Sequence, residues 1–242
     1  MEHIVDGRPM NNQEIKEFLL AAAENPKYPE FLGMLNQEKI VDIDSMLVKA
    51  SYIFDLVDAE QKTIEVGRIV VLDNEEHSLN VHLSSYENIE TSVSVFSFGG
   101  DILTNKVLKQ IDIVGEDSVL KSEFAFEGDL NTDMEVLPYN NTSYTPGQTK
   151  EKIKAAWNWD EFCAPGGYKH CGKQCGDKGR WGGGKPINDL DYCCRTHDRC
   201  YDNFGFGHCK CDTPLVKCAK SLRSKYWIVA NVIIKVFGPK AC

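Results

Sequence analysis

Chemically active side chains crowd into one short stretch, DYCCRTHDRCY, at Asp191–Tyr201. It contains neither Gly nor Pro, and just before it Pro186 and Asn188 or Asp189 supply residues typical of a helix start. The stretch therefore predicts a helix, and its three cysteines would anchor that helix to neighbouring segments.

Four side chains of this predicted helix can reach one cavity. Cys194, His197 and Tyr201 follow one another at spacings of three and four, so they lie close to one face. Asp198 is displaced from His197 by about 100° around the helix axis, which lets an imidazole and a carboxylate face the same space. The pattern predicts that the chemistry of this chain is centred here.

Two flanking segments extend the constellation. Upstream, residues 174–184 form a glycine-rich loop that can turn several backbone carbonyls onto a hard cation, and Asp198 would add the carboxylate that calcium prefers. Downstream, Cys209–Asp212 precedes a second helix-like stretch that runs through Cys218 to Lys225. Asp212 is well placed to hold a histidine of the facing helix through its far ring nitrogen. The cysteines do not form the paired CxxC units of a zinc ribbon, which argues against zinc.

The 242-residue chain divides into two unlike parts. All ten cysteines lie between Cys163 and Cys242, and residues 151–242 carry 16 Lys and Arg against 9 Asp and Glu, a net charge of +7. Residues 1–150 contain no cysteine and carry 11 Lys and Arg against 27 Asp and Glu, a net charge of −16. Such a cysteine density is typical of disulfide-stabilised extracellular domains. We therefore expect secretion, although the first residues lack signal-peptide features and no segment reaches the roughly 18 apolar residues of a membrane span.

The acidic part predicts an α+β or β-rich domain. Asn11 or Asn12 can cap a helix that ends near Pro26, and residues 42–59 are expected to form a second helix. Alternating or β-branched runs between Gly, Asn and Asp then predict an antiparallel sheet or a small sandwich. The predicted strands are Thr63–Leu72, Ser78–Tyr86, Thr91–Phe98, Leu108–Val114, Ser122–Phe126 and Met134–Leu137. We expect this domain at residues 1–138, a polar, protease-accessible linker at 139–156 and the cysteine-rich domain at 157–242.

The motif around His197 is similar to the active-site helix of secreted, calcium-dependent phospholipases A2. The resemblance covers about residues 160–225 and is carried by Cys193–Tyr201, by Pro186 eleven residues before His197, and by Cys211-Asp212 with Cys218. It implies a small, disulfide-rich, all-α domain with two antiparallel helices and a calcium loop. The implied reaction is calcium-dependent hydrolysis of the sn-2 ester of glycerophospholipids at a membrane surface, which yields a lysophospholipid and a fatty acid.

The resemblance implies a role for each matching residue. His197 is the general base that deprotonates a water, Asp212 fixes its tautomer and orientation, and Tyr201 hydrogen-bonds Asp212. Asp198 is the carboxylate ligand of Ca²⁺, which polarises the ester carbonyl and stabilises the oxyanion together with a backbone N–H group from Gly176. No acyl-enzyme is implied, and no obvious serine nucleophile stands near His197.

The calcium loop departs from the family pattern. The family has Tyr or Trp, Cys, Gly, any residue, Gly, Gly; this chain has Gln174 in place of the aromatic residue, and its second glycine, Gly179, comes one residue late. The backbone carbonyls of Gln174, Gly176 and Gly179 are expected to bind the ion, with Lys178 as an alternative. A second frame, on residues 170–172 (His-Cys-Gly), stays open.

The resemblance also implies the disulfide bonds Cys175–Cys194, Cys200–Cys211 and Cys193–Cys218. Four cysteines remain, and we expect Cys209–Cys242 and Cys163–Cys171 among them, although the sequence alone leaves other pairings open.

Alternative interpretations concern the C-terminal segment and the activity. Residues 226–237 are almost wholly apolar but too short to cross a bilayer. They predict either a core element of the small domain or an interfacial patch, where Lys220, Arg223, Lys225 and Lys235 would attract anionic lipid.

The acidic chain has no nucleic-acid-binding motif, which argues against nucleic acid as a partner. The rival activity is a phospholipase-like toxin or binding module that damages membranes without hydrolysis. The opposite charges of the two parts also predict intramolecular masking of the basic part by the acidic one.

Overall fold

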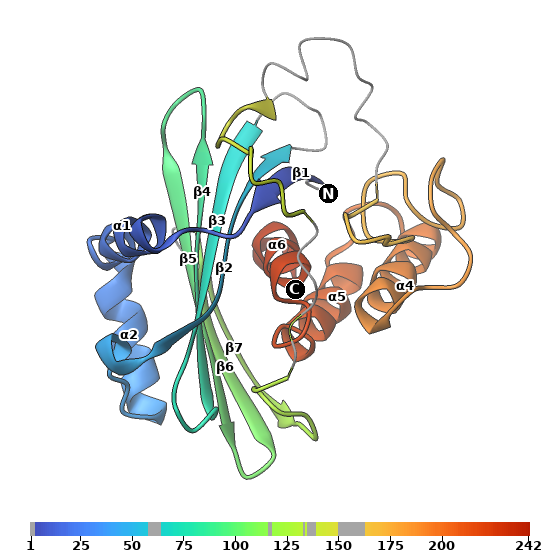
Figure 1. Ribbon diagram of the computed structural model, residues 1–242. Helices are drawn as coiled ribbons and strands as arrows, with labels where there is room; N and C mark the ends of the chain where they lie inside the picture. Colours follow the sequence, from blue (N-terminus) through green and yellow to red (C-terminus); the bar gives the residue numbers. More distant parts are fainter. Residues whose placement is uncertain (1–2, 58–63, 116–117, 133, 135–138, 150–162) are drawn as a thin grey trace.

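The computed structural model describes residues 3–57, 64–115, 118–132, 134, 139–149 and 163–242. In these ranges seven strands form one antiparallel sheet, with two helices on one face and the C-terminal helices on the other (Figure 1). This arrangement agrees with the predicted order of a β-rich part followed by a disulfide-bonded helical part. No helix of the described residues is long and apolar enough to cross a membrane.

The sheet is a simple meander, because each strand pairs with the next one along the chain. The first elements are β1 (His3–Arg8), α1 (Asn12–Ala23), α2 (Lys27–Glu38) and a short 3-10 helix at Ile43–Ser45. The other strands are β2 (Leu47–Val57), β3 (Ile64–Asp73), β4 (Leu79–Asn88), β5 (Ser94–Thr104), β6 (Val107–Val114) and β7 (Ser118–Ala125).

The predicted helix start at Asn11 or Asn12 is confirmed at α1. The Asn11 side chain accepts the backbone N–H groups of Gln13 and Glu14 at 3.0 Å, and the Glu14 carboxylate accepts the Asn11 N–H at 2.8 Å. This reciprocal capping satisfies N–H groups that have no partner within the helix. It starts the helix where Phe18 and Ala22 point into the core against the sheet.

The predicted helix at residues 42–59 is wrong, because β2 occupies most of that range. From Tyr52 to Val57 every residue of β2 is buried, since the strand pairs with β1 and β3 and is covered on both faces. A run that is buried on both faces does not alternate, so its periodicity cannot distinguish a strand from a helix.

The sequence patterns also missed β1 and α2. Of the last predicted strand, Met134 is not in a strand and residues 135–137 lie outside the described residues.

Two adjacent glycines of β5 let side chains approach both faces of the sheet. A Cβ atom at Gly100 would lie 2.3 Å from Leu35 Cδ2 of α2, and one at Gly99 would lie 2.6 Å from a guanidinium nitrogen of Arg223. Both distances are far below van der Waals contact. The Gly-Gly pair therefore allows α2 to pack on one face and a charged side chain to reach the other.

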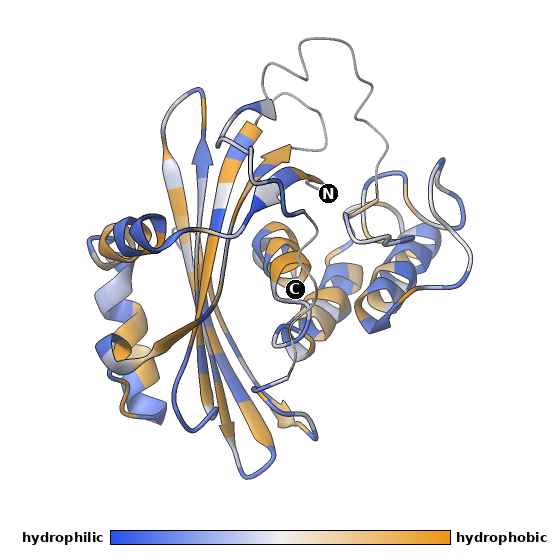
Figure 2. Ribbon diagram, in the orientation of Figure 1, coloured by the Kyte–Doolittle hydropathy of each residue, from blue (hydrophilic) through white to orange (hydrophobic). Residues whose placement is uncertain are grey.

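The C-terminal part comprises α4 (Asp189–Phe204), α5 (Cys209–Ser221) and α6 (Trp227–Phe237). Helix α6 is the most apolar of them in Figure 2, and nine of its eleven residues are buried. Trp227, Ile228 and Val232 pack into a cluster with the sheet, whereas the opposite side of α6 packs with α4 and α5. The segment 226–237 is thus a core element, as one of the two interpretations predicted. That core is shared with the sheet rather than confined to the small domain.

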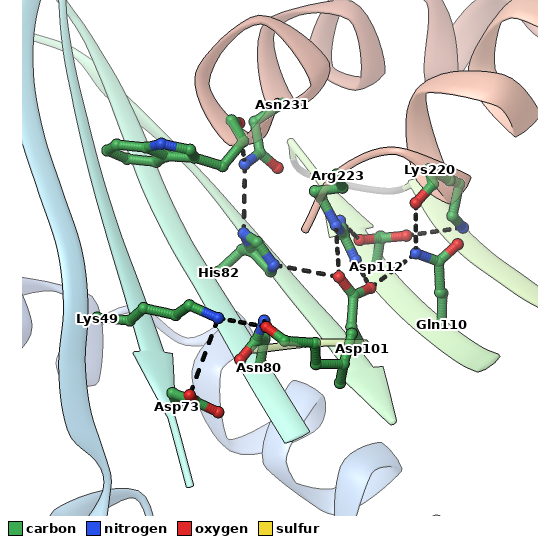
Figure 3. A network of polar contacts seen from close by, with 12 residues as sticks. Lys49, Asp73, Asn80, His82, Asp101, Gln110, Asp112, Lys220, Arg223 and Asn231 are labelled. Atoms are coloured by element: carbon green, nitrogen blue, oxygen red, sulfur yellow. Dashed lines mark hydrogen bonds and ion pairs between the residues drawn. The ribbon is translucent and has the colours of Figure 1, made fainter. Parts of the chain in front are cut away.

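A buried cluster of charges joins the two parts (Figure 3). We call it the junction cluster: His82 of β4, Asp101 of β5, Asp112 of β6, Lys220 of α5 and Arg223 of the α5–α6 turn. The Arg223 guanidinium is 1% exposed and donates to both aspartates, and Lys220 Nζ lies 2.7 Å from Asp112 Oδ2. His82 Nε2 lies 3.2 Å from Asp101 Oδ2, and its Nδ1 faces Asn231 of α6 at 3.4 Å. Two of the four basic residues predicted to attract lipid, Lys220 and Arg223, are therefore neutralised inside the protein, whereas Lys225 is exposed.

The first part of the predicted linker also packs on the sheet. Tyr144 is buried and its hydroxyl donates to Asp55 of β2 at 2.6 Å, while the Thr149 N–H donates to the other oxygen of the same carboxylate at 2.9 Å. Residues 139–149 are therefore not a free connection. Residues 150–156 of the predicted linker lie outside the described residues.

Acidification is expected to weaken the junction cluster through His82. Burial lowers the pKa of this imidazole, Arg223 lowers it further, and Asp101 and Asp112 oppose the shift. The unfolded chain takes up this proton near pH 6.5 and the folded chain only at lower pH. The stabilisation is therefore complete above about pH 6.5 and is lost as the pH falls below that value.

The measurement is urea unfolding of the full chain between about pH 7 and pH 5. The midpoint should fall with pH, and it should fall less steeply in His82→Gln, which keeps a donor for Asp101. Identical slopes for the two proteins would rule out this contribution.

Candidate active site

Two antiparallel helices carry the candidate site. The Asn188 side chain caps α4 by accepting the Asp191 N–H at 2.8 Å. The disulfides Cys193–Cys218 and Cys200–Cys211 join the beginning of α4 to the end of α5 and the end of α4 to the beginning of α5. Such crossed links require the two helices to run in opposite directions, and both pairings are the expected ones.

His197, Asp212 and Tyr201 form one hydrogen-bonded group between these helices. His197 Nε2 lies 2.8 Å from Asp212 Oδ1, and the Tyr201 hydroxyl donates to the same oxygen at 2.5 Å. Asp212 is fully buried and His197 is 6% exposed. Because the carboxylate holds the proton on Nε2, the imidazole keeps Nδ1 as its acceptor. The structure thus brings together the three residues that the sequence analysis named as catalytic.

The surroundings of His197 favour its neutral form. Burial lowers the pKa of the imidazole, and the Asp212 carboxylate opposes this shift. The Tyr201 ring lies 4.1 Å from the imidazole, centroid to centroid, and Phe237 of α6 presents its ring at 5.0 Å and an interplanar angle of 69°. A neutral, oriented imidazole with a free lone pair can accept a proton from a water.

Asp198 supplies a buried carboxylate whose second oxygen lacks a partner. Asp198 Oδ2 makes no hydrogen bond to any described residue. Burial raises the pKa of Asp198 to about 8, with contributions from the carboxylates of Asp202, Asp191 and Asp177. A bound cation would satisfy the oxygen and offset this repulsion.

The glycine loop lies against this carboxylate. A Cβ atom at Gly176 would lie 2.7 Å from Asp198 Oδ2, so only glycine allows the backbone to approach so closely. Among the described residues, no three His, Cys, Asp or Glu side chains converge as a metal-binding group. Further ligands of a cation at Asp198 would therefore be backbone carbonyls, which suit Ca²⁺. The residues present fit a hard divalent cation.

The loop itself is held by backbone hydrogen bonds that use some of the predicted groups. The Trp181 N–H donates to Gln174 O, and the Gly179 N–H donates to Gly176 O, each at 3.1 Å. The Gly176 N–H, the predicted oxyanion donor, donates to Trp181 O at 3.1 Å. Gly179 packs on the Gln174 carbonyl, where a Cβ atom would lie 2.1 Å from the oxygen. The structure thus brings Gly176 to Asp198, and Gln174 and Gly179 shape the loop.

Ion pairs hold this loop to α4. The Asp177 carboxylate accepts from Arg199 at 2.9 Å and from Arg195 at 3.2 Å, and the Gly184 N–H donates to it at 3.0 Å. The Arg199 guanidinium, the Gly184 N–H and Arg195 lower the pKa of Asp177 to about 2. The loop therefore has a fixed position next to Asp198.

The expected pairings Cys175–Cys194 and Cys163–Cys171 are wrong. The structure has Cys171–Cys194 and Cys163–Cys175, and the expected Cys209–Cys242 bond is present. The cause lies at the beginning of α4, where the Asp191 carboxylate accepts the backbone N–H groups of residues 169, 170 and 171. This contact places Cys171 beside Cys194, so the cysteine of the second frame is the one bonded to α4.

The sequence analysis gave no role to His170 or to the Asp191 carboxylate. His170 is 1% exposed, its Nε2 lies 3.0 Å from Gly184 O, and its Nδ1 has no partner among the described residues. A Cβ atom at Gly176 would lie 3.5 Å from His170 Nδ1 and 2.7 Å from Asp198 Oδ2, so both groups lie against Gly176. An acidic residue in the first turn of a helix was the available signal for Asp191. No sequence signal distinguished His170 from an ordinary loop histidine.

A pocket of about 300 Å³ opens beside His197. Its lining is almost entirely apolar and comes from the two helices: Tyr192, Cys193, Thr196, His197 and Cys200 of α4, and Cys211, Pro214, Leu215 and Cys218 of α5. An apolar pocket with a histidine at its wall suits a hydrocarbon chain attached to a reactive group.

Comparison with known proteins finds similarity over a short segment. The chain is 60% identical over 25 residues to basic phospholipase A2 DE-1 of Hemachatus haemachatus, which is 10% of this chain and 21% of that protein. It is 62% identical over 24 residues to basic phospholipase A2 1 of Naja melanoleuca, which is 10% and 20% of the two chains. No family model matches, and no solved structure matches. The chain spans about a fifth of the length of these relatives, and it contains a segment similar to basic phospholipases A2.

Proposed function

We propose that the protein hydrolyses the sn-2 acyl ester of glycerophospholipids in a calcium-dependent reaction. The observation that carries the proposal is the group His197–Asp212–Tyr201, whose imidazole stands next to the unpartnered carboxylate of Asp198 in the chain. The short segment similar to basic phospholipases A2 supports it as well.

The chain's own residues account for the proton transfers. His197 Nδ1 takes a proton from a water, and the water oxygen bonds to the ester carbonyl carbon. Asp212 stabilises the imidazolium that forms, through the 2.8 Å contact with Nε2. The imidazolium then gives the proton to the departing glycerol oxygen as the ester bond breaks, so His197 ends neutral and no acyl-enzyme forms.

Asp198, with carbonyls of the adjacent glycine loop, would hold the cation. When bound, Ca²⁺ supplies a Lewis acid that polarises the ester carbonyl and offsets the charge developing on its oxygen. Asp198→Asn keeps the shape of the side chain and removes its charge. Calorimetric titration of the full chain should detect calcium binding in the wild type and at least tenfold weaker binding in Asp198→Asn. Equal affinities would contradict the assignment of Asp198.

The substrate surface is proposed to be a phospholipid membrane. Exposed apolar side chains gather in α4 and the segments directly before and after it: Trp181, Ile187, Tyr192, Phe204 and Phe206. Phe206 is 95% exposed, and Tyr192 also lines the pocket beside His197. Aromatic side chains of this kind favour the boundary between water and lipid.

Removing these aromatic groups should weaken membrane binding. The double variant Phe204→Ala with Phe206→Ala is expected to lower partitioning into phospholipid vesicles by at least tenfold, because each ring buries apolar area in the lipid. Val93→Ala is the control, since Val93 is 59% exposed in the connection between β4 and β5, outside α4 and its flanking segments. Cosedimentation with vesicles measures both. A double variant that partitions like the control would assign lipid contact to another surface.

Secretion is proposed with this function. Five disulfide bonds with no free cysteine among the described residues fit an extracellular protein.

The rival activity, membrane damage without hydrolysis, is favoured by one observation. Gln174 O, Gly176 O and the Gly176 N–H, which were predicted to serve the cation and the oxyanion, already form hydrogen bonds within the loop. Membrane damage in the absence of fatty-acid release would identify that rival.

A further inference from the structure

Helix α6 touches the sheet on one side and the candidate catalytic histidine at its end. Trp227 meets Tyr52 of β2 edge-on, with ring centroids 6.4 Å apart, and Ile228 and Val232 belong to the same cluster of the sheet. Phe237, the last residue of α6, is 8% exposed and presents its ring to the His197 imidazole at 5.0 Å. A single rigid helix therefore links residues of the two parts that are far apart in sequence.

Polar contacts fix α6 to the sheet along its length. In the turn directly before it, Arg223 is paired with Asp101 and Asp112 in the junction cluster. In its middle, the Asn231 side chain faces His82 of β4. Near its end, Lys235 forms an ion pair with Glu65 of β3, two residues before Phe237.

The chain end adds a second restraint behind Phe237. The Cys209–Cys242 disulfide ties the last residue to the beginning of α5, and the Cys242 N–H donates to Thr213 at 2.9 Å. A Cβ atom at Gly238 would lie 3.0 Å from Leu120 Cδ1 of β7. Phe237 is thus held between the sheet, α5 and the disulfide.

We infer that Phe237 is a positioning residue for His197 and that the β-sheet sets the position of Phe237 through α6. The imidazole is fixed at Nε2 by Asp212 and on one face by the Tyr201 ring. Phe237 supplies a third contact, and an aromatic edge against a ring restricts rotation about the Cβ–Cγ bond. The β-rich part would then be a component of the catalytic apparatus. A merely attached domain would not affect His197.

The inference rests on the proposed function for its kinetic consequence, but its geometric part can be tested without substrate. In the neutral imidazole, the Nε2–H proton is protected from water by its hydrogen bond to Asp212. Exchange of this proton with water, measured by NMR on ¹⁵N-histidine-labelled full chain, reports the stability of that orientation. Phe237→Ala should accelerate exchange about tenfold or more, and Phe237→Leu should restore most of the protection because Leu refills the space.

Two controls separate positioning from general loss of packing. Val229→Ala removes apolar volume from the same helical cluster at the other end of α6, and should leave exchange unchanged at equal folded fraction. Glu65→Gln removes the ion pair to Lys235 and should accelerate exchange in the same direction as Phe237→Ala, but less. Glu87→Gln removes a matched ion pair, to Arg68 at 2.8 Å, between β3 and β4, and should have no effect.

Kinetics provide the second readout. Phe237→Ala should lower kcat for phospholipid hydrolysis roughly tenfold to a hundredfold with KM changed less than twofold, since a small misplacement of a catalytic group affects the chemical step. The role of Phe237 would be overturned if Phe237→Ala had the exchange rate and the kcat of the wild type. It would also be overturned if Val229→Ala changed both quantities as much as Phe237→Ala does. An effect of Phe237→Ala without any effect of Glu65→Gln would overturn the role of the sheet. If the wild type releases no fatty acid, the proposed function fails, and the exchange measurement alone decides this inference.

Discussion

Replacing His197 with Gln is expected to lower kcat for phospholipid hydrolysis by about a thousandfold, because the loss of a general base typically costs a factor of about 10² to 10⁴. Gln retains an amide donor for Asp212 and therefore preserves the hydrogen bond seen at 2.8 Å. It has no basic nitrogen with which to accept a proton from water. Fatty-acid release from vesicles measures the effect.

The matched control is His77→Gln, because His77 is an exposed residue of the turn between β3 and β4. It should retain the wild-type rate. A His197→Gln protein with more than a tenth of the wild-type kcat would show that His197 is not the base. Membrane damage that survives His197→Gln would belong to the non-hydrolytic rival.

Replacing Arg223 with Met is expected to lower the free energy of unfolding by about 3–5 kcal/mol, since it leaves buried carboxylates without their partner. Arg223 is 1% exposed and contacts both Asp101 and Asp112, which are as deeply buried. Lys220 still neutralises Asp112 in the variant, whereas Asp101 keeps only neutral partners. Chemical denaturation of the full chain measures the loss.

Arg68→Met is the control for this variant. Arg68 forms an ion pair with Glu87 at 2.8 Å, but both side chains are partly exposed to water. Such a pair contributes about 0–1 kcal/mol. If the two variants unfold at the same denaturant concentration, the junction cluster does not hold the two parts together.

The opposite net charges of the two parts meet at this junction. Arg223 and Lys220 come from the basic part, and Asp101 and Asp112 come from the acidic part. Masking of the helical part by the acidic one stays a prediction. Within the described part of the chain, the pocket beside His197 is lined by α4 and α5, and the sheet covers one side of α6. The sheet packs on α6 and also contacts α5 through the Lys220–Asp112 ion pair, so an influence of the sheet on activity would act through these two helices.

Local sequence patterns predicted the helical site well, because its residues interact over short spacings. The helix around His197 and the facing Asp212 follow from residue type and spacing, and the structure has both in one hydrogen-bonded group. The cap at Asn11 is another local pattern that the structure confirms. Such interactions depend on neighbours three or four residues away, which the sequence displays directly.

Features that depend on contacts between distant segments could not be predicted in this way. The pairing of Cys171 with Cys194 follows from the Asp191 carboxylate and the backbone at residues 169–171, about twenty positions away. Strand β2 was taken for a helix because helices packed on both sides of the sheet bury both of its faces, so its sequence does not alternate. Phe237 of α6 contacts His197 of α4 only because the chain folds α6 against α4, which no local pattern displays.

Calcium-dependent hydrolysis of phospholipid is the function that we propose for this chain. The most direct test is fatty-acid release from phospholipid vesicles by the oxidised full chain, with millimolar calcium and with EGTA. We predict release with calcium and its loss with EGTA, because Asp198 and the adjacent glycine loop fit the ion. Absence of release in both conditions, with the five disulfides verified and the lipid head groups varied, would contradict the account.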